Sequence, residues 1–379
     1  MKHYIAASVA TTLLASSAMA SGLDRTGQPI GLIFEEGTYA EFSFATTDVE
    51  LSGNDRTSLN PFGSATGDVG KRFNMLSGGF KTDITEQLSL AVIFDQPWGV
   101  DVDYPTTGGS ALLGGTMAQA DSNALTALLR YKFNDRFSVH GGLRYQETDG
   151  EITLAGAAYN ATVPLSGYNV KVGRDGAFGW VAGVAYEIPD IALRFALTYQ
   201  SEIEHNFDLV ETTPAGVPFI GGTTLNTNTT TKTPQSVNLD FQSGIAKDTI
   251  LFGNVRWAEH SATDLVVLGA LGGRDLIDID DSFTYTIGVG RRFNQNWSAS
   301  LAYIYEDADG DNLVSPLAPT HGMEAIRLGV QYQTEKMKVA AGVRYTKLGD
   351  AVAAPGGTPV ANFNDNDALS LAVKVGFYF

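Results

Sequence analysis

The chain of 379 residues carries 42 acidic and 25 basic side chains, which gives a formal net charge of -17 at pH 7, and it contains no cysteine. The negative charge argues against nucleic acid as a partner, because a duplex repels an acidic protein. Without disulfides, an exported chain of this size needs a large core or a closed sheet. Its 42 glycines and 20 phenylalanines are many for an ordinary soluble domain.

The first twenty residues have the pattern of a secretory signal. Lys2 and His3 give a basic start, residues 5–14 form an apolar run, and Ala18-Met19-Ala20 suits cleavage before Ser21. A membrane-anchoring helix is the weaker alternative, because this run is shorter than the ~20 apolar residues that a spanning helix needs. No later run is long and apolar enough to predict a spanning helix.

The rest of the chain alternates between apolar and polar or small residues with a period of two, which is the pattern of strands. The clearest example is the carboxyl end, where residues 369–379 place apolar side chains at every second position. About fourteen strands are predicted, at residues 38–51, 73–82, 88–96, 122–132, 137–149, 177–188, 191–207, 234–244, 249–258, 283–293, 297–306, 326–332, 337–345 and 369–379.

The connections between these strands are of two kinds. Short polar turns, such as residues 134–135 and 294–296, alternate with long segments. The long segments are residues 101–121, 149–176, 208–233, 259–281, 306–323 and 348–367. Short turns at one end and long loops at the other are typical of an up-and-down barrel.

The two faces of the predicted strands differ in a way that suits lipid. One face is apolar and ends in aromatic residues such as Trp297 and Tyr305, which is typical of girdles at the two membrane interfaces. A soluble sandwich would have a polar outer face. The opposite face carries polar and charged residues that a dry core would not tolerate, namely Arg130, Arg144, Arg194, Asn254, Arg256, Arg327, Arg344 and Lys374. We therefore predict an all-β protein, a transmembrane outer-membrane β-barrel that spans residues 37–379 and ends on the aromatic Phe379.

Residues 176–207 contain a glycine-tryptophan strand, GAFGW, followed by a TYQSE strand. Residues 233–261 and 291–308 continue this series of strands. In their order and spacing, the three stretches resemble the FadL family of outer-membrane long-chain fatty-acid transporters. The resemblance covers most of the mature chain.

The resemblance implies a fourteen-strand barrel with an amino-terminal hatch, here residues 21–36, a hydrophobic binding site and a lateral opening in the wall. The family's Asn-Pro-Ala motif, followed by Gly-Leu, is matched by Gln28-Pro29-Ile30-Gly31-Leu32, where only Pro, Gly and Leu agree. It also implies passive uptake of long-chain fatty acids or similar hydrophobic molecules, and a location in the outer membrane of a Gram-negative bacterium. A monomer surrounded by lipid and lipopolysaccharide is expected.

The run of residues 88–104, which begins with the third predicted strand, contains Pro97, Trp98 and Gly99. Proline cannot donate a hydrogen bond to a neighbouring strand, and glycine has no side chain to fill a gap. In the resembling family, a kink in the third strand leaves the lateral opening, and these three residues are our candidates for it. The alternative is a strand that ends at the membrane surface beside a tryptophan of the aromatic girdle.

Two long segments, residues 110–120 and 154–168, are unusually apolar for exposed loops. By position they match the family's two loops that capture apolar ligands. The candidates for hydrophobic ligand binding are Leu112, Leu113, Met117, Leu154, Tyr159, Val163 and Leu165. The alternative is that the loops pack on each other as a lid. Arg144 and Arg194 are candidates for binding a ligand's carboxylate, because arginine can hold it with two hydrogen bonds.

Catalytic and metal chemistry find little support. The five histidines lie far apart, so no metal site or cofactor is predicted. Ser138 and His140 share a strand face, but no third group completes a catalytic set, so no enzyme is predicted. Two other kinds of transporter stay open: a general diffusion porin for small polar solutes and a transporter of aromatic hydrocarbons.

Overall fold

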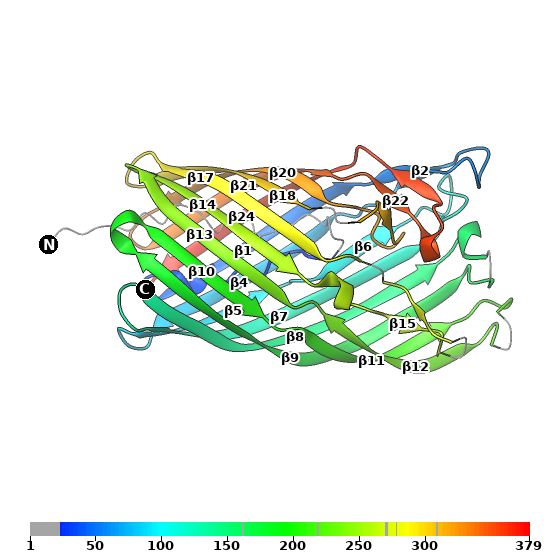
Figure 1. The fold of residues 1–379 in the computed structure, drawn as a ribbon, viewed down its shortest axis with the longest axis horizontal. Coiled ribbons are helices and arrows are strands. Elements are labelled where there is room, and N and C mark those ends of the chain that lie inside the picture. Colours follow the sequence, from blue (N-terminus) through cyan, green and yellow to red (C-terminus); the bar gives the residue numbers. More distant parts are fainter. Residues whose placement is uncertain (1–22, 161–162, 218–219, 270–271, 278, 308–309) are drawn as a thin grey trace.

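A computed structural model describes residues 23–160, 163–217, 220–269, 272–277, 279–307 and 310–379. The predicted signal at residues 1–20 lies outside these ranges. The main element is one closed antiparallel sheet (Figure 1). Its strands are β1 (Tyr39–Glu50), β4 (Phe73–Asp83), β5 (Leu88–Asp95), β6 (Gly99–Asp103), β7 (Met117–Lys132), β8 (Phe137–Leu154), β9 (Tyr168–Ile188), β10 (Leu193–Gln200), β11 (Ile203–Thr212), β12 (Thr224–Thr233), β13 (Ser236–Ala246), β14 (Thr249–Ala258), β17 (Ser282–Arg292), β18 (Trp297–Glu306), β20 (Met323–Gln333), β21 (Met337–Leu348) and β24 (Asp367–Tyr378).

Three barrel strands are each divided into two segments, so the 17 segments make fourteen barrel strands. β5 and β6 both pair with β7, and β10 and β11 both pair with β9. β12 pairs with β11, and β13 with β10. The barrel closes where β1 pairs with β4 on one side and β24 on the other. The prediction of an antiparallel barrel of about fourteen strands is confirmed.

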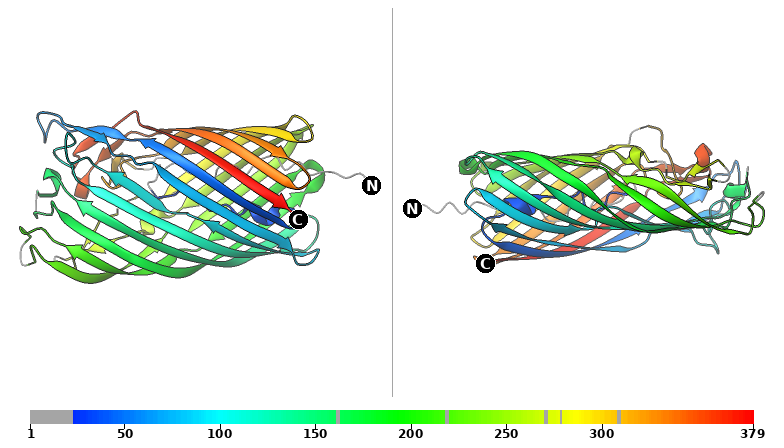
Figure 2. Two further views of the ribbon diagram at one scale, coloured as in Figure 1. Left: turned by 180° about the vertical axis from the view of Figure 1, so that it is seen from behind. Right: turned by 90° about the horizontal axis from the view of Figure 1, so that it is seen from below.

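Smaller elements gather at the end of the barrel that carries the long loops (Figure 2). A five-stranded sheet contains β2 (Ser52–Asp55), β3 (Ala65–Asp68), β19 (Leu313–Val314), β22 (Ala351–Ala353) and β23 (Ala361–Phe363). β15 (Val266–Val267) pairs with β16 (Arg274–Asp275). The short helices η2 (Ala157–Asn160), η4 (His260–Ala262) and η6 (Pro355–Gly357) belong to the long connections, whereas η1 (Gly31–Phe34) lies in the amino-terminal segment and η3 (Pro189–Ile191) in the short turn between β9 and β10. Within the described ranges, no helix has the length and apolar character needed to cross a membrane.

The strands at the loop end are longer than predicted. The segments 149–176 and 208–233 were expected to be loops, but β8 and β9 extend into the first, and β11 and β12 occupy most of the second. The reason is a change of pattern along the barrel. In β11 every second side chain is buried, including Phe207 and Leu209, while the exposed positions are mostly polar. Beyond the lipid belt the apolar face points inward, so a search for lipid-facing apolar residues misses these extensions.

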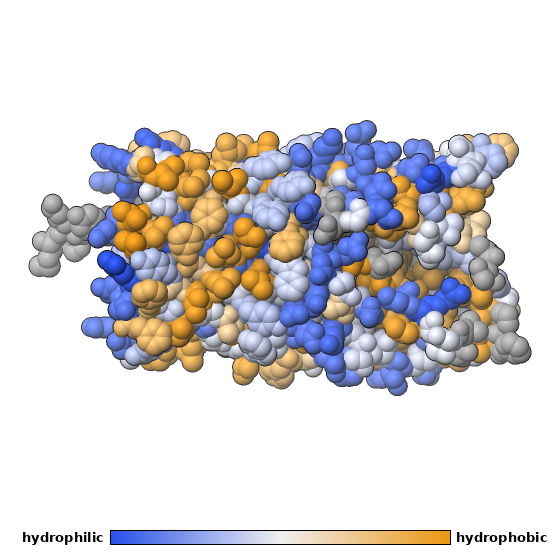
Figure 3. All heavy atoms as spheres, in the orientation of Figure 1, coloured by the Kyte–Doolittle hydropathy of each residue, from blue (hydrophilic) through white to orange (hydrophobic). Residues whose placement is uncertain are grey.

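The wall has an apolar outer face and a charged inner face, as predicted. Leu301 in β18 is 53% exposed, whereas Arg130, Arg144 and Arg344 are buried. Figure 3 shows apolar side chains gathered over the part of the barrel that carries the short turns, and more polar side chains toward the loop end. The outer apolar band suits the hydrocarbon region of a membrane, which offers no water to a charged side chain.

This band leads to a stability prediction. Leu301→Arg should destabilise the folded barrel in a bilayer by about 2–4 kcal/mol, because it places a guanidinium among lipid tails. Asn228→Arg is the matched control, since Asn228 is exposed on β12 at the loop end and should change the free energy of unfolding by less than about 0.5 kcal/mol. Denaturant unfolding in vesicles measures both. Equal effects of the two substitutions would place the lipid belt elsewhere.

Candidate functional site

The amino-terminal segment, residues 23–36, lies inside the ring of strands (Figure 2). Asp24 pairs with Arg256 of β14 at 2.5 Å, and Arg25 pairs with Asp121 of β7 at 2.8 Å. At its other end, Glu35 pairs with Lys338 of β21 at 2.8 Å. The segment is therefore held by charges on several parts of the wall.

The hydrogen-bonded ladder between β4 and β5 stops partway along the wall. It runs from the Asp83 and Ser89 pair to the Gly78 and Phe94 pair. Beyond Phe94 the next segment, β6, pairs with β7 and is not a ladder partner of β4. An isolated antiparallel β-bridge pairs Gly70, just before β4, with Val102 of β6, and it marks the other end of the break. Between these points β4 keeps its ladder with β1 but lacks one toward the third barrel strand.

The amino-terminal segment supplies hydrogen-bond partners to backbone groups of the third barrel strand at this break. The amide of Arg25 donates to the carbonyl oxygen of Pro97 at 2.8 Å, and the amide of Gly99 donates to that of Leu23 at 2.9 Å. A side chain on Gly99 would collide with this partner, because its Cβ would lie 2.2 Å from Arg25 Cζ. The atoms in the way belong to the Arg25 guanidinium, so a side chain on Gly99 would have to displace the group that pairs with Asp121.

Trp98 points into the barrel and not toward lipid. Its side chain is only 5% exposed. The ring packs edge-on against His260, with 5.7 Å between ring centroids, and the guanidinium of Arg256 lies 5.6 Å from its centroid. The Trp98 ring therefore does not face lipid, and the strand resumes directly after it as β6.

Asp95, the last residue of β5, joins the break to the barrel interior. Its carboxylate accepts hydrogen bonds from Arg144 Nη2 at 3.0 and 3.1 Å. It also accepts one from Thr26 Oγ1 of the amino-terminal segment at 3.1 Å. Arg144, a predicted ligand for a carboxylate, thus lies against a carboxylate of the chain itself, and its other terminal nitrogen donates to Gln200 at 3.0 Å.

Gln28 continues this polar network on the far side of the amino-terminal segment. Its carbonyl oxygen accepts from Gln200 at 2.9 Å, and its side-chain oxygen accepts from Ser236 at 2.8 Å and from Arg256 at 3.2 Å. Gln28 has a positive φ of 52°, which is uncommon for a residue with a side chain. The chain therefore turns at Gln28, where it is held by Gln200 of β10 on one side and by Ser236 and Arg256 on the other.

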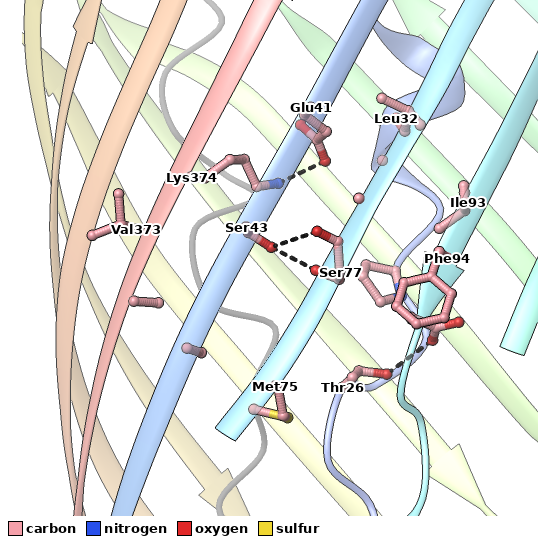
Figure 4. Close-up of a pocket in the computed structure, with 16 residues that line it drawn as sticks. Thr26, Leu32, Glu41, Ser43, Met75, Ser77, Ile93, Phe94, Val373 and Lys374 are labelled. Atoms are coloured by element: carbon pink, nitrogen blue, oxygen red, sulfur yellow. Dashed lines mark hydrogen bonds and ion pairs between the residues drawn. The ribbon is translucent and has the colours of Figure 1, made fainter. Parts of the chain in front are cut away.

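A cavity of about 90 Å³ lies beside the break, between the amino-terminal segment and β1, β4, β5 and β24 (Figure 4). Thr26 and Leu32 line it from inside the barrel. Phe94 and Val373 line it as well, and these side chains are 37% and 48% exposed on the outer face. The cavity therefore has walls that belong to both faces of the barrel. Its motif residues are Pro29 and Gly31.

A second cavity of about 150 Å³ lies on the other side of the amino-terminal segment, against strands from β10 to β21. Its lining includes Ile30 and four arginines, Arg194, Arg256, Arg327 and Arg344. Arg194, a predicted ligand for a carboxylate, donates to Gln242 at 3.2 Å and stacks on Phe34. Arg194 thus faces a cavity, whereas Arg144 lies in an ion pair.

The predicted apolar ligand residues lie together at the loop end of the barrel. Leu112, Leu113, Leu154 and Leu165 are buried in one apolar cluster. Tyr159 and Val163 are partly buried and pack against it, and Met117 is partly exposed at the start of β7. The two loops also contact each other directly, because the amide of Ala158 donates to the carbonyl oxygen of Leu112 at 3.0 Å. Ligand binding by these residues stays a prediction.

Sequence reasoning missed the charged partners that fix the amino-terminal segment. These are Asp24, Arg25, Asp95, Asp121 and Arg256. Of these, Arg256 was expected to face inward, but none was expected to hold the amino-terminal segment. The available signal was the pair of charges in Asp24-Arg25 directly after the predicted signal peptide, but the partners lie 96 and 232 residues away. Ser138 accepts from Arg130, and His140 bonds Thr198, so they are not arranged as nucleophile and base.

A closed barrel with a lipid-facing outer belt, a charged interior and a segment threaded inside defines an outer-membrane transport protein. The family described as "Outer membrane protein transport protein (OMPP1/FadL/TodX)" matches residues 29–376, so the chain belongs to this family. It is a transporter of the Gram-negative outer membrane and not an enzyme, and its family transports hydrophobic compounds. The sequence-based assignment to the FadL family is confirmed.

Solved structures show the same fold at low sequence identity. A Pseudomonas aeruginosa FadL homologue is 13% identical, with a TM-score of 0.73 over 98% of this chain and 96% of the homologue. The Pseudomonas putida toluene transporter TodX is 10% identical, with a TM-score of 0.66 over 96% and 93%. The Ralstonia pickettii toluene transporter TbuX is 12% identical, with a TM-score of 0.63 over 97% and 99%. No curated protein sequence matches the chain significantly.

The Asp95 and Arg144 pair leads to a second stability prediction. Asp95→Asn should lower the free energy of unfolding by about 3 kcal/mol or more, because it leaves a buried guanidinium without its counter-charge. Asp149→Asn is the control, since Asp149 pairs with Arg174 on the exposed surface, and its loss should cost less than about 1 kcal/mol. Denaturant unfolding in detergent or vesicles measures both. A small effect at Asp95 would mean that this pair does not hold the break.

His260 leads to a prediction for pH. It is fully buried against Trp98, and burial lowers the pKa of its imidazole from 6.5 to about 4. The folded state therefore favours the neutral ring, while the unfolded chain takes up a proton below pH 6.5. Stability should fall between pH 6.5 and pH 4, by up to about 3 kcal/mol more in the wild type than in His260→Phe. Unfolding measured at pH 7 and pH 4 tests this. Parallel losses in the two proteins would contradict it.

Proposed function

We propose that the protein takes up long-chain fatty acids or similar hydrophobic molecules passively and releases them sideways through its wall, at the break between β4 and the third barrel strand. The observation that carries this proposal is the cavity beside the break, which has walls on both the inner and the outer face of the barrel. An apolar molecule that leaves here enters the hydrocarbon region without crossing water, which is favourable for every apolar group it carries.

The lining of the break suits an apolar molecule. Leu32, Met75, Ile93 and Phe94 contribute apolar surface. On the β4 side the ladder toward β5 ends at Gly78, which has no side chain to obstruct the path. In an intact wall the positions beyond the Gly78 and Phe94 pair would be closed by backbone hydrogen bonds and packed side chains. The end of the ladder at this pair makes it the natural place for a lateral exit.

The apolar cluster at the loop end is the proposed place of first capture. Tyr159 and Val163 are the partly buried members of the predicted ligand set, so they offer apolar surface at its edge. Leu113 is fully buried and serves the packing of the same cluster. The two loops can serve both as a lid and as a capture surface. The buried leucines pack the lid, and a ligand would first meet Tyr159 and Val163 at the edge of the cluster.

Aromatic hydrocarbons are the second candidate cargo, since two of the similar solved proteins are toluene transporters. A general diffusion porin is the less favoured function. A porin needs a continuous aqueous lumen, whereas here the amino-terminal segment crosses the interior and a large apolar cluster occupies the loop end.

A disulfide across the break tests the lateral exit. Leu76 and Gln96 follow the last ladder pair at Gly78 and Phe94, and the Leu76 amide donates to the Gln96 side chain at 2.8 Å. The chain has no cysteine of its own. Oxidised Leu76→Cys/Gln96→Cys should lose uptake of radiolabelled oleate and of toluene, and reduction should restore it, because the bond closes the exit.

The control is Leu301→Cys/Leu328→Cys, which places the same bond between β18 and β20, where the ladder is intact. It should leave uptake unchanged. Uptake that survives a complete disulfide across the break would rule out this exit. Substituting Gly99 is a poorer test, since any side chain there collides with Arg25. Comparing oleate with toluene shows which cargo class the protein prefers.

A further inference from the structure

The wall contains a second interrupted ladder, between β9 and the barrel strand made of β10 and β11, which lie side by side in Figure 1. The ladder of β9 with β10 ends at the Val181 and Gln200 pair, and the ladder of β9 with β11 begins only at the Val172 and Leu209 pair. All positions between these pairs belong to the described part of the chain, and none of them forms a ladder pair across this interruption, which we call the seam. The two ladders keep one register, so the strands stay adjacent along the seam.

Side chains hold the seam together at two places. Toward the short turns, the Ser201 amide donates to the carbonyl oxygen of Trp180 at 3.0 Å, and the Ser201 Oγ accepts from the Trp180 amide at 2.9 Å. Toward the long loops, the Asp175 carboxylate accepts from the Asn206 amide at 3.3 Å and lies 3.0 Å from His205 Nδ1. A part of the wall that is held by a few such bonds opens at a lower free energy than a continuous ladder.

One lip of the seam has little side-chain bulk. This lip includes the GAFGW stretch of β9, with Gly176 and Gly179. A Cβ on Gly179 would lie 2.6 Å from Ile203 Cγ1, so the Ile203 side chain of the opposite lip covers this glycine. Ile203 is buried on the inner face of β11. The seam is therefore filled by a side chain from one strand, and movement of that side chain alone leaves the glycine lip unobstructed.

The seam runs from the membrane interface to the apolar cluster at the loop end. Near the short-turn end of the seam, Trp180 packs against Tyr199 with 4.9 Å between ring centroids, and Trp180 is 50% exposed, as in an aromatic girdle. Farther along β9 the outer face becomes charged, with the exposed side chain of Arg174. On the inner side, Phe207 of β11 belongs to the buried apolar cluster. A molecule that passes the seam from the outer leaflet therefore meets this cluster directly.

We propose that the seam is a second lateral opening, an entrance through which a neutral apolar molecule dissolved in the outer leaflet reaches the apolar cluster, and that Asp175 is its latch. Apolar molecules concentrate in a membrane because the transfer of apolar surface out of water is favourable. An entrance in the wall collects them from the membrane without a return to water. This entrance rests on the proposed capture of cargo by the cluster, and it does not depend on the exit between β4 and the third barrel strand.

Photolabelling of the full-length protein in vesicles tests the entrance. The probe is a trifluoromethyl-phenyldiazirine, a small neutral aromatic molecule that dissolves in the bilayer. Peptide mass spectrometry should find label on Ile203 and Phe207, although both side chains are buried on the inner face. In Asp175→Cys/Asn206→Cys, a short reversible bis-methanethiosulfonate cross-link should abolish this label because it ties the two lips together. Reduction of the cross-link should restore the label.

The control cross-link is Asn206→Cys/Thr230→Cys, which shares position 206. It lies within the intact ladder of β11 and β12, where the Thr230 hydroxyl donates to the Asn206 side chain at 2.9 Å. It does not join β11 to β9, so labelling of Ile203 and Phe207 should stay unchanged. Label that persists when the seam is fully cross-linked, that is absent before cross-linking, or that both cross-links abolish equally would overturn the entrance.

Asp175→Ala tests the latch. It should speed hydrogen exchange of the Asn206 amide and raise the labelling of Ile203 by about tenfold or more, the usual effect of losing a charge-assisted hydrogen bond. Asp149→Ala is the matched control, because it removes a carboxylate that pairs with Arg174 on the exposed surface nearby, and it should change neither quantity. Equal effects of the two substitutions, or no effect of Asp175→Ala, would show that this carboxylate is not the latch.

Sealing the other opening separates the entrance from the lateral exit. Oxidised Leu76→Cys/Gln96→Cys should keep the label on Ile203 and Phe207, because the probe enters at the seam. Loss of this label would mean that apolar molecules reach the interior only through the break beside β4, which contradicts a second entrance. Oleate uptake that survives in the same oxidised protein would count against the exit alone. Failure of the entrance and failure of the exit are therefore distinguishable.

Discussion

The structure depends on one constraint: every backbone N–H and C=O in the wall needs a hydrogen-bond partner, because lipid supplies none. Closure of β1 onto β24 meets this requirement around the ring. The third barrel strand lacks this pairing toward β4 between Phe94 and Val102. The groups at residues 97–99 instead find partners inside the barrel, on the amino-terminal segment and on Ser122. A wall break is stable here because a second piece of chain replaces the missing strand.

The buried charges inside the barrel also need partners. Arg144 with Asp95 and Arg256 with Asp24 are each buried, and a buried charge is tolerable only beside a counter-charge with further hydrogen bonds. These pairs form the two ends of a network that passes through Gln200 and Gln28. The polar interior thereby fixes the path of the amino-terminal segment, and this path separates the cavity at the break from the arginine-lined cavity opposite it.

The sequence predicted those features that follow from local alternation. The fourteen barrel strands and the inward direction of Arg130, Arg144 and Arg344 follow from a period of two. Pro97 and Gly99 drew attention to residues 97–99 by their backbone chemistry, and their role in a lateral opening stays a prediction. Alternation could not show that Trp98 turns inward, because a break removes the register that decides the face. The search for alternating residues also missed the strands in residues 208–233. Their outer face meets water and not lipid, so their polar residues point outward and their apolar residues inward. Ion pairs such as Asp24 with Arg256 depend on closure of the whole barrel and have no local signature.

The threaded amino-terminal segment also has a consequence for assembly. Its contacts join Asp24 to Arg256, 232 residues away, and Glu35 to Tyr378, 343 residues away. Tyr378 lies on β24, the last strand of the barrel, which closes the wall against β1. The contacts of the amino-terminal segment are therefore complete only when the last barrel strand is in place.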